Sequence, residues 1–352
     1  MTALAGIVTN SASGRDIRRL VSRASVFPNA EKCAMVQRTL AALGAVGVER
    51  ALVMTDTGGI AAGVLRAWQR GTREVAGWPE LEFLDLPLTE TAADTTAAVA
   101  AMVEREAGAI VVLGGDGTNR VVAGACRDVP IVSLSTGTNN VFPELREATV
   151  AGLAAGLVAT GRIPAEEVCR RNKVLVVEGA GRRELALVDV CATTHAAVAA
   201  RAVWEVESLR ALFVSFAEPD AIGLSAIAGL VHPVGRDEPW GLALDLAPAA
   251  QARFRVRAPI APGLVVDVGV DDIRPMAPGE PWTVPAGTGV IALDGEREIE
   301  PDGPVAGPFS PTVSLDLDGP RTIDVRRCLQ LAAEDSLLRD GGVLARPVLR
   351  GL

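Results

Sequence analysis

Residues 109–123 read Ala109-Ile110-Val111-Val112-Leu113-Gly114-Gly115-Asp116-Gly117-Thr118-Asn119-Arg120-Val121-Val122-Ala123. The first five are apolar, a run short enough for a buried parallel strand, and the last five are compatible with the start of a helix. Glycines let a backbone approach a ligand closely, and the N–H groups at a helix start bind phosphate. We therefore expect a nucleotide-binding turn at the carboxyl edge of an α/β sheet.

Asp116 lies between glycines of this turn. A carboxylate among phosphates serves mainly to hold Mg²⁺ or to accept a proton from an attacking hydroxyl. A tight turn without a ligand is the alternative, but such a turn does not require an aspartate here. The residue types favour phosphoryl transfer.

The pattern around this turn predicts a two-domain protein. Up to about residue 162, short apolar runs alternate with alanine-rich helical stretches, which is typical of a doubly wound α/β sheet. From about residue 168, short strands are separated by glycines and prolines, which predicts a mostly antiparallel, sandwich-like β domain. We place the α/β nucleotide-binding domain at 1–145 and the β domain at 146–319. The last helix, within 320–352, can pack back on either domain, with the first as the placement that we favour. A cleft between them would hold the ligands.

Composition narrows the function classes. The 352 residues exceed what one core usually supports, and the net charge of -9 argues against nucleic acid or an anionic membrane surface as the partner. No apolar run reaches the roughly 20 residues of a membrane span, so we expect a cytoplasmic protein without stable membrane association. Five scattered cysteines and two histidines disfavour a disulfide framework, a structural zinc site and a Ser-His-Asp hydrolase.

Three further polar segments occur where strands are expected to end or turn. Residues 10–15 (Asn-Ser-Ala-Ser-Gly-Arg) follow the first strand and suit phosphate binding, with an ordinary turn and helix cap as the alternative. Residues 135–140 (Ser-Thr-Gly-Thr-Asn-Asn) would meet the glycine-rich turn at the same sheet edge. Residues 294–296 (Asp-Gly-Glu) follow a late strand, and a simple hairpin turn is the alternative there.

Together and in this order, the four motifs resemble those of the superfamily that unites NAD kinases with diacylglycerol and sphingosine-type lipid kinases. The resemblance is closest to the acetoin-catabolism protein X branch, commonly described as NAD-kinase-like, and covers essentially the whole chain. It implies an enzyme that uses ATP with Mg²⁺ to phosphorylate a hydroxyl of a small molecule. The first acceptor it implies is the 2′-hydroxyl of the adenosine ribose of NAD, which would give NADP.

Site residues follow from the motifs and from this resemblance. Catalytic roles fall on Asp116, Glu296 and Asp294, and Asp294 would also hold Mg²⁺. Asp189 would take the place of the acid with which NAD kinases bind the nicotinamide nucleotide. Arg201 is a candidate to bind a phosphate of the acceptor, although an exposed helical arginine needs no such role. The candidate nucleotide-binding residues are Asn10, Gly14, Arg15, Gly114, Gly115, Gly117, Thr118, Asn119, Thr136, Gly137, Thr138 and Asn139.

Departures from the family pattern leave the acceptor open. Asn10-Ser11 lacks the proline of the first motif, and Val188-Asp189 stands where NAD kinases carry Asn-Glu. The loop at 136–140 is closer to that of the lipid kinases, so a lipid or another small metabolite is the second acceptor. No segment has the basic amphipathic face expected of an enzyme acting on a membrane surface.

Two other classes of protein fit the sequence less well. A nucleotide-sensing protein with little catalysis is one alternative, although the retained carboxylates argue against it. A Rossmann dehydrogenase is disfavoured because no G-x-G-x-x-G follows the first strand. The phosphoryl donor is open among ATP, other nucleoside triphosphates and polyphosphate. We expect a homo-oligomer, as is common in the superfamily.

Overall fold

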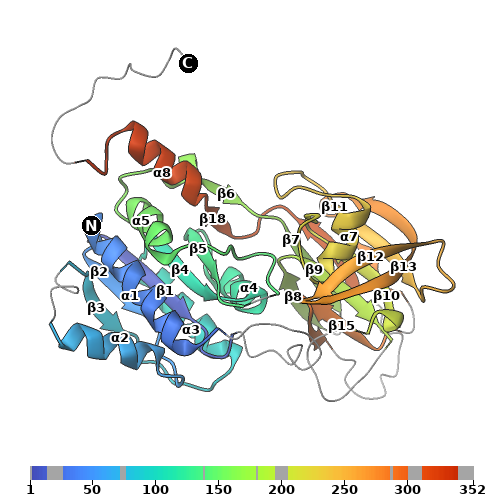
Figure 1. The fold of residues 1–352 in the computed structure, drawn as a ribbon, viewed down its shortest axis with the longest axis horizontal. Coiled ribbons are helices and arrows are strands. Elements are labelled where there is room, and N and C mark those ends of the chain that lie inside the picture. Colours follow the sequence, from blue (N-terminus) through green and yellow to red (C-terminus); the bar gives the residue numbers. More distant parts are fainter. Residues whose placement is uncertain are drawn as a thin grey trace, which may run out of the picture.

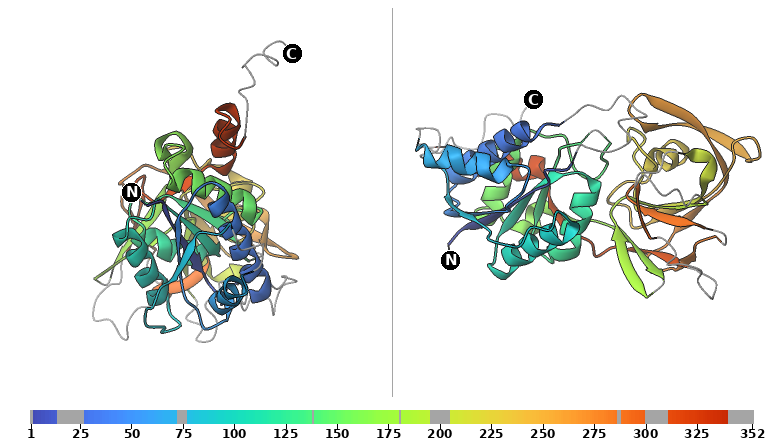
Figure 2. Two further views of the ribbon diagram at one scale, coloured as in Figure 1. Left: turned by 90° about the vertical axis from the view of Figure 1, so that its left-hand side faces the viewer. Right: turned by 90° about the horizontal axis from the view of Figure 1, so that it is seen from below.

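The computed structural model describes residues 2–13, 27–71, 77–137, 139–179, 181–194, 205–285, 288–299 and 311–339. They form two bodies that lie side by side, an α/β domain and a β domain (Figures 1 and 2). This arrangement confirms the expected fold class, a doubly wound α/β domain followed by antiparallel sheets.

A seven-stranded sheet forms the centre of the α/β domain. Its order is β3 (Glu80–Phe83), β2 (Arg50–Val53), β1 (Leu4–Thr9), β4 (Ala109–Gly114), β5 (Ile131–Ser135), β18 (Arg321–Ile323) and β6 (Cys169–Arg171). Neighbours from β3 to β18 are parallel, and β6 pairs antiparallel with β18. The order reverses between β1 and β4. Open α/β sheets bind ligands at the carboxyl ends of the strands beside such a reversal.

Helices cover both faces of this sheet because its strands are apolar on both sides. In β4, Ala109, Val111 and Leu113 belong to one core, and Ile110 and Val112 belong to the other. A strand buried on both faces explains the uninterrupted apolar run before the glycines. The first core is covered by α1 (Asn29–Ala45), α2 (Ile60–Gln69), α5 (Ala148–Ala159) and α8 (Val325–Glu334), and the second by α3 (Ala92–Glu104) and α4 (Asp116–Ala125).

The α/β domain extends beyond residue 145, where we expected it to end. Helix α5 packs along α1, and Gly152 permits the close approach, because a Cβ there would lie 2.9 Å from the Cβ of Ala42. After the short α6 (Ala165–Val168), β6 joins the edge of the same sheet. The chain leaves this domain before β7 (Val174–Gly179) and returns to it with β18 and α8.

Two antiparallel sheets form the β domain. The larger sheet has the order β12 (Phe254–Ala261), β13 (Leu264–Met276), β11 (Gly241–Ala247), β10 (Leu209–Val214), β9 (Asp189–Thr193), β15 (Val290–Leu293) and β16 (Glu296–Ile299). The smaller has the order β14 (Trp282–Thr283), β17 (Thr312–Asp316), β7 (Val174–Gly179) and β8 (Arg182–Ala186). A 3₁₀ turn, Val206–Ser208, precedes β10. Leu175, Phe213 and Ile291 belong to one core shared by the two sheets, and α7 (Ser225–Val231) packs against β12 and β10.

The two domains share an apolar core. Val122 of α4 and Phe142 belong to the same buried cluster as Val176, Leu187 and Phe216 of the β domain. The start of α4, where Asp116 lies, is therefore close to the junction between the domains.

Lys173 lies on the segment that crosses from β6 to β7. Its ammonium donates hydrogen bonds to the carbonyl oxygens of Gly235 (2.9 Å) and Trp240 (2.8 Å) of the β domain. Burial lowers the pKa of Lys173 to about 8, although Glu238 and Asp237 partly oppose this shift. The buried ammonium thus links the crossing segment to the loop that leads into β11.

We expect Lys173 to make the stability of the fold depend on pH. Between the folded pKa of about 8 and the ordinary value of 10.5, the unfolded chain holds the extra proton, so this lysine makes the fold more stable as pH rises. Its contribution has a slope of at most about 1.4 kcal/mol per pH unit. The pKa values of Cys126 and Cys169, raised to about 11 by burial, act in the opposite direction.

Urea unfolding at pH 7, 8.5 and 10 of the wild type and of Lys173→Met tests this expectation. The difference between the two proteins removes the cysteine contribution. The free energy of unfolding of the wild type should rise relative to that of Lys173→Met as the pH increases above 8. A difference that is constant over this range would contradict the assigned pKa.

Candidate active site

Three loops meet at the carboxyl ends of β1, β4 and β5. The Asn10 amide nitrogen donates to the Thr118 hydroxyl (2.9 Å), which joins the loop after β1 to the start of α4. The hydroxyls of Ser13 and Thr136 lie 2.8 Å apart and join the loop after β1 to the loop after β5. Side chains from three of the predicted motifs are thus cross-linked at the point where the strand order reverses.

Glycines allow the second and third loops to pack this closely. A Cβ at Gly115 would lie 2.7 Å from Oδ1 of Asn140, and one at Gly137 would lie 2.8 Å from its Nδ2. Asn140 is itself held by a hydrogen bond from its Nδ2 to the Ser135 hydroxyl (2.8 Å). A Cβ at Gly114 would lie 2.5 Å from the Cβ of Thr118. A side chain at Gly115 would push the second and third loops apart, and one at Gly114 or Gly137 would distort its own loop.

Asp116 is the first residue of α4 and is only 8% exposed. Its Oδ1 accepts hydrogen bonds from the backbone N–H groups of Phe142 (2.8 Å) and Val141 (3.1 Å), and its Oδ2 lies 3.1 Å from the same Val141 nitrogen. These donors fix the orientation of the carboxylate. They also tie the glycine-rich turn to the segment that follows the third loop.

Two asparagines of these loops differ in their environment. Asn119 is fully buried, and its Nδ2 donates to the Gly115 carbonyl (2.9 Å), which closes the turn from inside. The Asn139 amide is buried near Gly223, and neither its oxygen nor its nitrogen has a hydrogen-bond partner within the described ranges. An unpaired buried amide costs about 1–3 kcal/mol. Asn139 is therefore a candidate ligand contact at the junction of the domains.

Lys32 is a site residue that we did not predict. It lies on α1 with no exposed surface, and its Nζ donates to the carbonyl oxygens of Asn10 (2.9 Å), Ser11 (3.3 Å) and Ser13 (2.8 Å). A tetrahedral ammonium can satisfy several such acceptors at once, which the planar guanidinium of arginine cannot do in the same space. Lys32 thus holds residues 10–13 of the loop after β1 in position through their carbonyl oxygens.

Asp294 holds the start of β9 in place. Its two oxygens accept hydrogen bonds from the backbone N–H groups of Leu187 (3.1 Å), Val188 (2.8 Å) and Asp189 (3.3 Å). The same carboxylate lies 3.8 Å from the Nε of Arg120 on α4. Burial raises the pKa of Asp294, and the Arg120 charge and the three N–H groups oppose that rise.

The position of Asp294 brings two predicted residues together. Asp189 is 4% exposed, and its carbonyl oxygen accepts the N–H of Asp294 (2.9 Å). Arg120, which we did not predict, connects this acidic pair to the helix that begins at Asp116. The β-domain turn and the glycine-rich turn therefore belong to one junction.

Other predicted residues lie outside the described part of the chain. These are Gly14, Arg15, Thr138 and Arg201. Glu296 begins β16, and only its backbone is described.

The described residues do not assemble a metal cage. No group of three His, Cys, Asp or Glu side chains within them has the geometry of a metal site. Asp294, the predicted metal ligand, already accepts three N–H hydrogen bonds beside Arg120. Mg²⁺ commonly binds enzymes through substrate phosphates with few protein ligands.

Two family models match adjoining parts of the chain. The model of the ATP-NAD kinase N-terminal domain matches residues 6–163, and that of the acetoin catabolism protein X C-terminal domain matches residues 172–306. The boundary between the matches falls where the chain leaves the first sheet. Together with the glycine-rich turn at the reversal of strand order, they define a protein of the NAD-kinase-like class.

A curated relative narrows this class. Acetoin catabolism protein X of Cupriavidus necator is 44% identical over 341 residues, which cover 95% of this chain and 93% of the relative. The chain belongs to the acetoin catabolism protein X family. Among solved structures, a candidate diacylglycerol kinase from Bacillus anthracis superposes with a TM-score of 0.43 at 11% identity, covering 91% of this chain and 97% of that one.

Proposed function

We propose that this protein transfers a phosphoryl group from ATP to a hydroxyl of a small molecule, and that NAD is the acceptor. The observation that carries this proposal is the cross-linking of three strand-end loops around Asp116, beside two buried carboxylates of the β domain. Phosphoryl transfer needs positioning and charge neutralisation more than covalent chemistry, so such a site has sufficient parts.

The residues divide into three groups in this proposal. Backbone N–H groups of the glycine-rich turn and of the loop after β5 receive the phosphates, since they lie at the carboxyl edge of the sheet. Asp116, oriented by its two N–H donors, contacts the acceptor hydroxyl and takes its proton. Asp189 and the unpaired amide of Asn139 supply polar contacts to the acceptor at the domain junction.

Asp294 acts as a positioning residue in this proposal. Its oxygens hold the backbone at residues 187–189 and so place Asp189, rather than approaching a substrate themselves. This differs from the catalytic and metal-binding roles that we first assigned to it. Glu296 keeps its proposed catalytic role.

NAD is the preferred acceptor because residues 6–163 match the model of the ATP-NAD kinase N-terminal domain. A lipid acceptor is the second candidate, supported by the Gly137-Thr138-Asn139 loop. Within the described residues, no helix has the length and apolar character needed to cross a bilayer.

A coupled assay tests the proposal. The protein is incubated with ATP, Mg²⁺ and NAD, NADP is read with an NADP-specific dehydrogenase, and ATP binding is measured separately by calorimetry. ATP-dependent NADP formation is the expected result. If ATP binds and diacylglycerol in mixed micelles is phosphorylated while no NADP forms, the acceptor is a lipid and not NAD. ATP binding without any product would favour a nucleotide sensor. A protein that does not bind ATP would contradict the assignment of the strand-end loops as a nucleotide site.

A further inference from the structure

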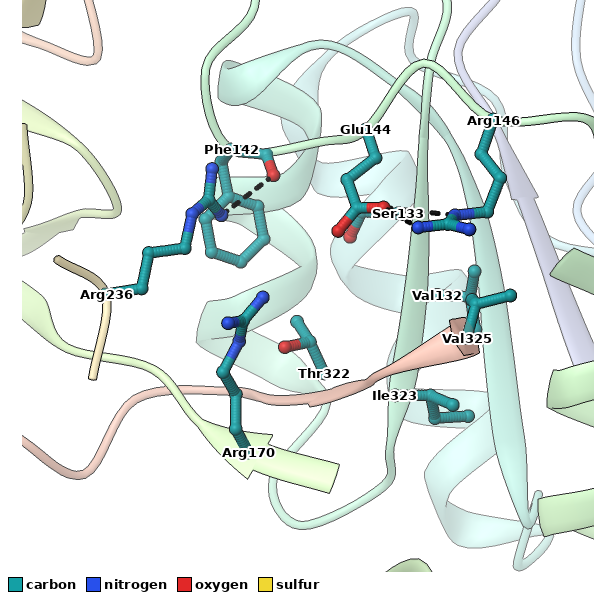
Figure 3. A pocket seen from close by; sticks show the side chains of 10 residues that line it. All are labelled: Val132, Ser133, Phe142, Glu144, Arg146, Arg170, Arg236, Thr322, Ile323 and Val325. Atoms are coloured by element: carbon teal, nitrogen blue, oxygen red, sulfur yellow. Dashed lines mark hydrogen bonds and ion pairs between the residues drawn. The ribbon is translucent and has the colours of Figure 1, made fainter. Parts of the chain in front are cut away.

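A polar pocket lies on the other side of residues 141–142, whose N–H groups hold Asp116. It is bounded by β5, by β6 and β18 at the sheet edge, and by residues 142–146, and its empty space, open solvent included, is about 360 Å³ (Figure 3). Three arginines line it, namely Arg146, Arg170 and Arg236, with Glu144 as the acidic lining residue. This concentration of guanidinium groups is notable in a chain whose net charge is -9.

Two of these arginines have close carboxylate partners. Arg146 is paired with Glu144, with its Nε 3.0 Å from Oε2, so the charge of Glu144 is neutralised within the pocket. Arg236 is paired with Glu218 at 3.1 Å. Arg170 differs, because among the described residues it is paired with the exposed Asp237, whose Oδ1 lies 3.9 Å from its Nη1. So long and exposed a pair neutralises little of the guanidinium charge. Arg170 is therefore the cation with charge available to a ligand.

Two buried polar atoms of the pocket lack partners. The Nε of Arg170 and the hydroxyl of Ser133 are both buried without a hydrogen-bond partner in the described ranges. Buried donors of this kind are normally satisfied by protein, water or a ligand. Guanidinium N–H groups and hydroxyls match the oxygens of a tetrahedral anion, and charge-assisted hydrogen bonds to such oxygens are strong.

Arg236 is fixed in place before any ligand arrives. Its guanidinium lies 4.2 Å from the ring centroid of Phe216, and it donates to the carbonyl oxygens of Val141 (2.7 Å) and Phe142 (3.3 Å). The side-chain view shows Arg236 and Arg170 extending toward the same space from different segments (Figure 3). A preorganised cation costs little ordering when it binds an anion.

We propose that this pocket is a binding site for a compact oxyanion of the phosphate type, recognised by Arg170, Arg236 and Ser133. The ligand is either inorganic phosphate or the phosphate group of a small metabolite. This site is distinct from the proposed nucleotide site. The carbonyls of Val141 and Phe142 face Arg236, whereas the N–H groups of the same two residues hold Asp116.

Calorimetric titration with sodium phosphate, against sodium chloride at matched ionic strength, tests the proposal. Because phosphate can also enter the glycine-rich loops, the variants decide the assignment. Arg170→Gln and Ser133→Ala should each weaken phosphate binding, Arg170→Gln by about tenfold or more. Glycerol 3-phosphate forms the second arm. Tighter binding of this ester, with the same dependence on Arg170, would identify a phosphorylated metabolite as the ligand.

Arg171→Gln is the matched control. Arg171 is the next residue of β6, has the same 36% side-chain exposure as Arg170, and is paired with Asp128 (2.6 Å) and Asp318 (3.0 Å). It should bind phosphate as the wild type does, and thermal unfolding without phosphate checks that both variants are folded. No phosphate binding up to 50 mM in the wild type, or equal binding in all variants, would overturn the proposal. Neither result would bear on ATP binding.

Discussion

Asp116→Asn is expected to lower turnover by about a hundredfold or more while the protein stays folded. The Asp116 carboxylate accepts hydrogen bonds from the backbone N–H groups of Val141 and Phe142, and the amide oxygen of an asparagine can still accept them. It cannot supply the negative charge or take a proton from an acceptor hydroxyl. Steady-state rates in the NADP-coupled assay, with circular dichroism and thermal unfolding of the same preparation, measure both effects.

Asp94→Asn is the matched control for this substitution. Asp94 also lies in the first turn of a helix, is 9% exposed, and accepts backbone N–H groups, those of Thr89 (2.8 Å) and Glu90 (2.8 Å). It follows β3, which is separated from β4 by β2 and β1. The two variants should lose similar stability, and only Asp116→Asn should lose turnover. Full activity of Asp116→Asn, or equal loss in both variants, would remove Asp116 from the mechanism.

The central part of this fold was predictable because its signals are local. Strands β1, β4 and β5 are short, mainly apolar runs followed by polar residues or glycines, and the helices of this domain are long enough to show their own composition. The carboxyl ends of neighbouring parallel strands lie at one edge, so loops 10–13, 114–118 and 135–140 had to be close. The observed hydrogen bonds between Asn10 and Thr118 and between Ser13 and Thr136 agree with that reasoning.

Other features depend on residues that are distant in sequence and carry little local signal. Strand β18 has three residues and joins the first sheet from position 321, which no periodicity can reveal. The Arg120–Asp294 contact joins two domains, and nothing near either residue indicates the other. The boundary at residue 145 put residues 148–171 in the β domain, although the helical pattern continues to about residue 162. Composition shows where strands become frequent, from about residue 168, but not which sheet a strand joins.

Lys32 did have a signal in the sequence. It is spaced three, four, seven and eight residues before Met35, Val36, Thr39 and Leu40, all buried on α1, so helical periodicity places it on the buried face. A lysine on such a face requires partners for its ammonium. Here the partners are the carbonyls of the loop after β1, which the charge of the residue alone could not have identified.

Lys32→Met is expected to lower the free energy of unfolding by about 3 kcal/mol and to weaken ATP binding by about tenfold or more. Methionine fills a similar volume but leaves the carbonyl oxygens of Asn10, Ser11 and Ser13 without the ammonium that holds them. The loop should then lose its shape, and with it the contact of Asn10 to Thr118. Urea unfolding and calorimetric titration with MgATP measure the two effects.

Lys173→Met separates loss of stability from loss of the site. Lys32 and Lys173 are the two lysines of the chain, both are buried, and both donate to backbone carbonyls. Lys173 serves the segment between the domains and has no bond to the strand-end loops in the described structure. Its variant should therefore lose stability and keep its affinity for ATP. If both variants bind ATP equally well, the loop shaped by Lys32 does not contribute to the nucleotide site. If both lose affinity in proportion to stability, Lys32 acts only through the fold.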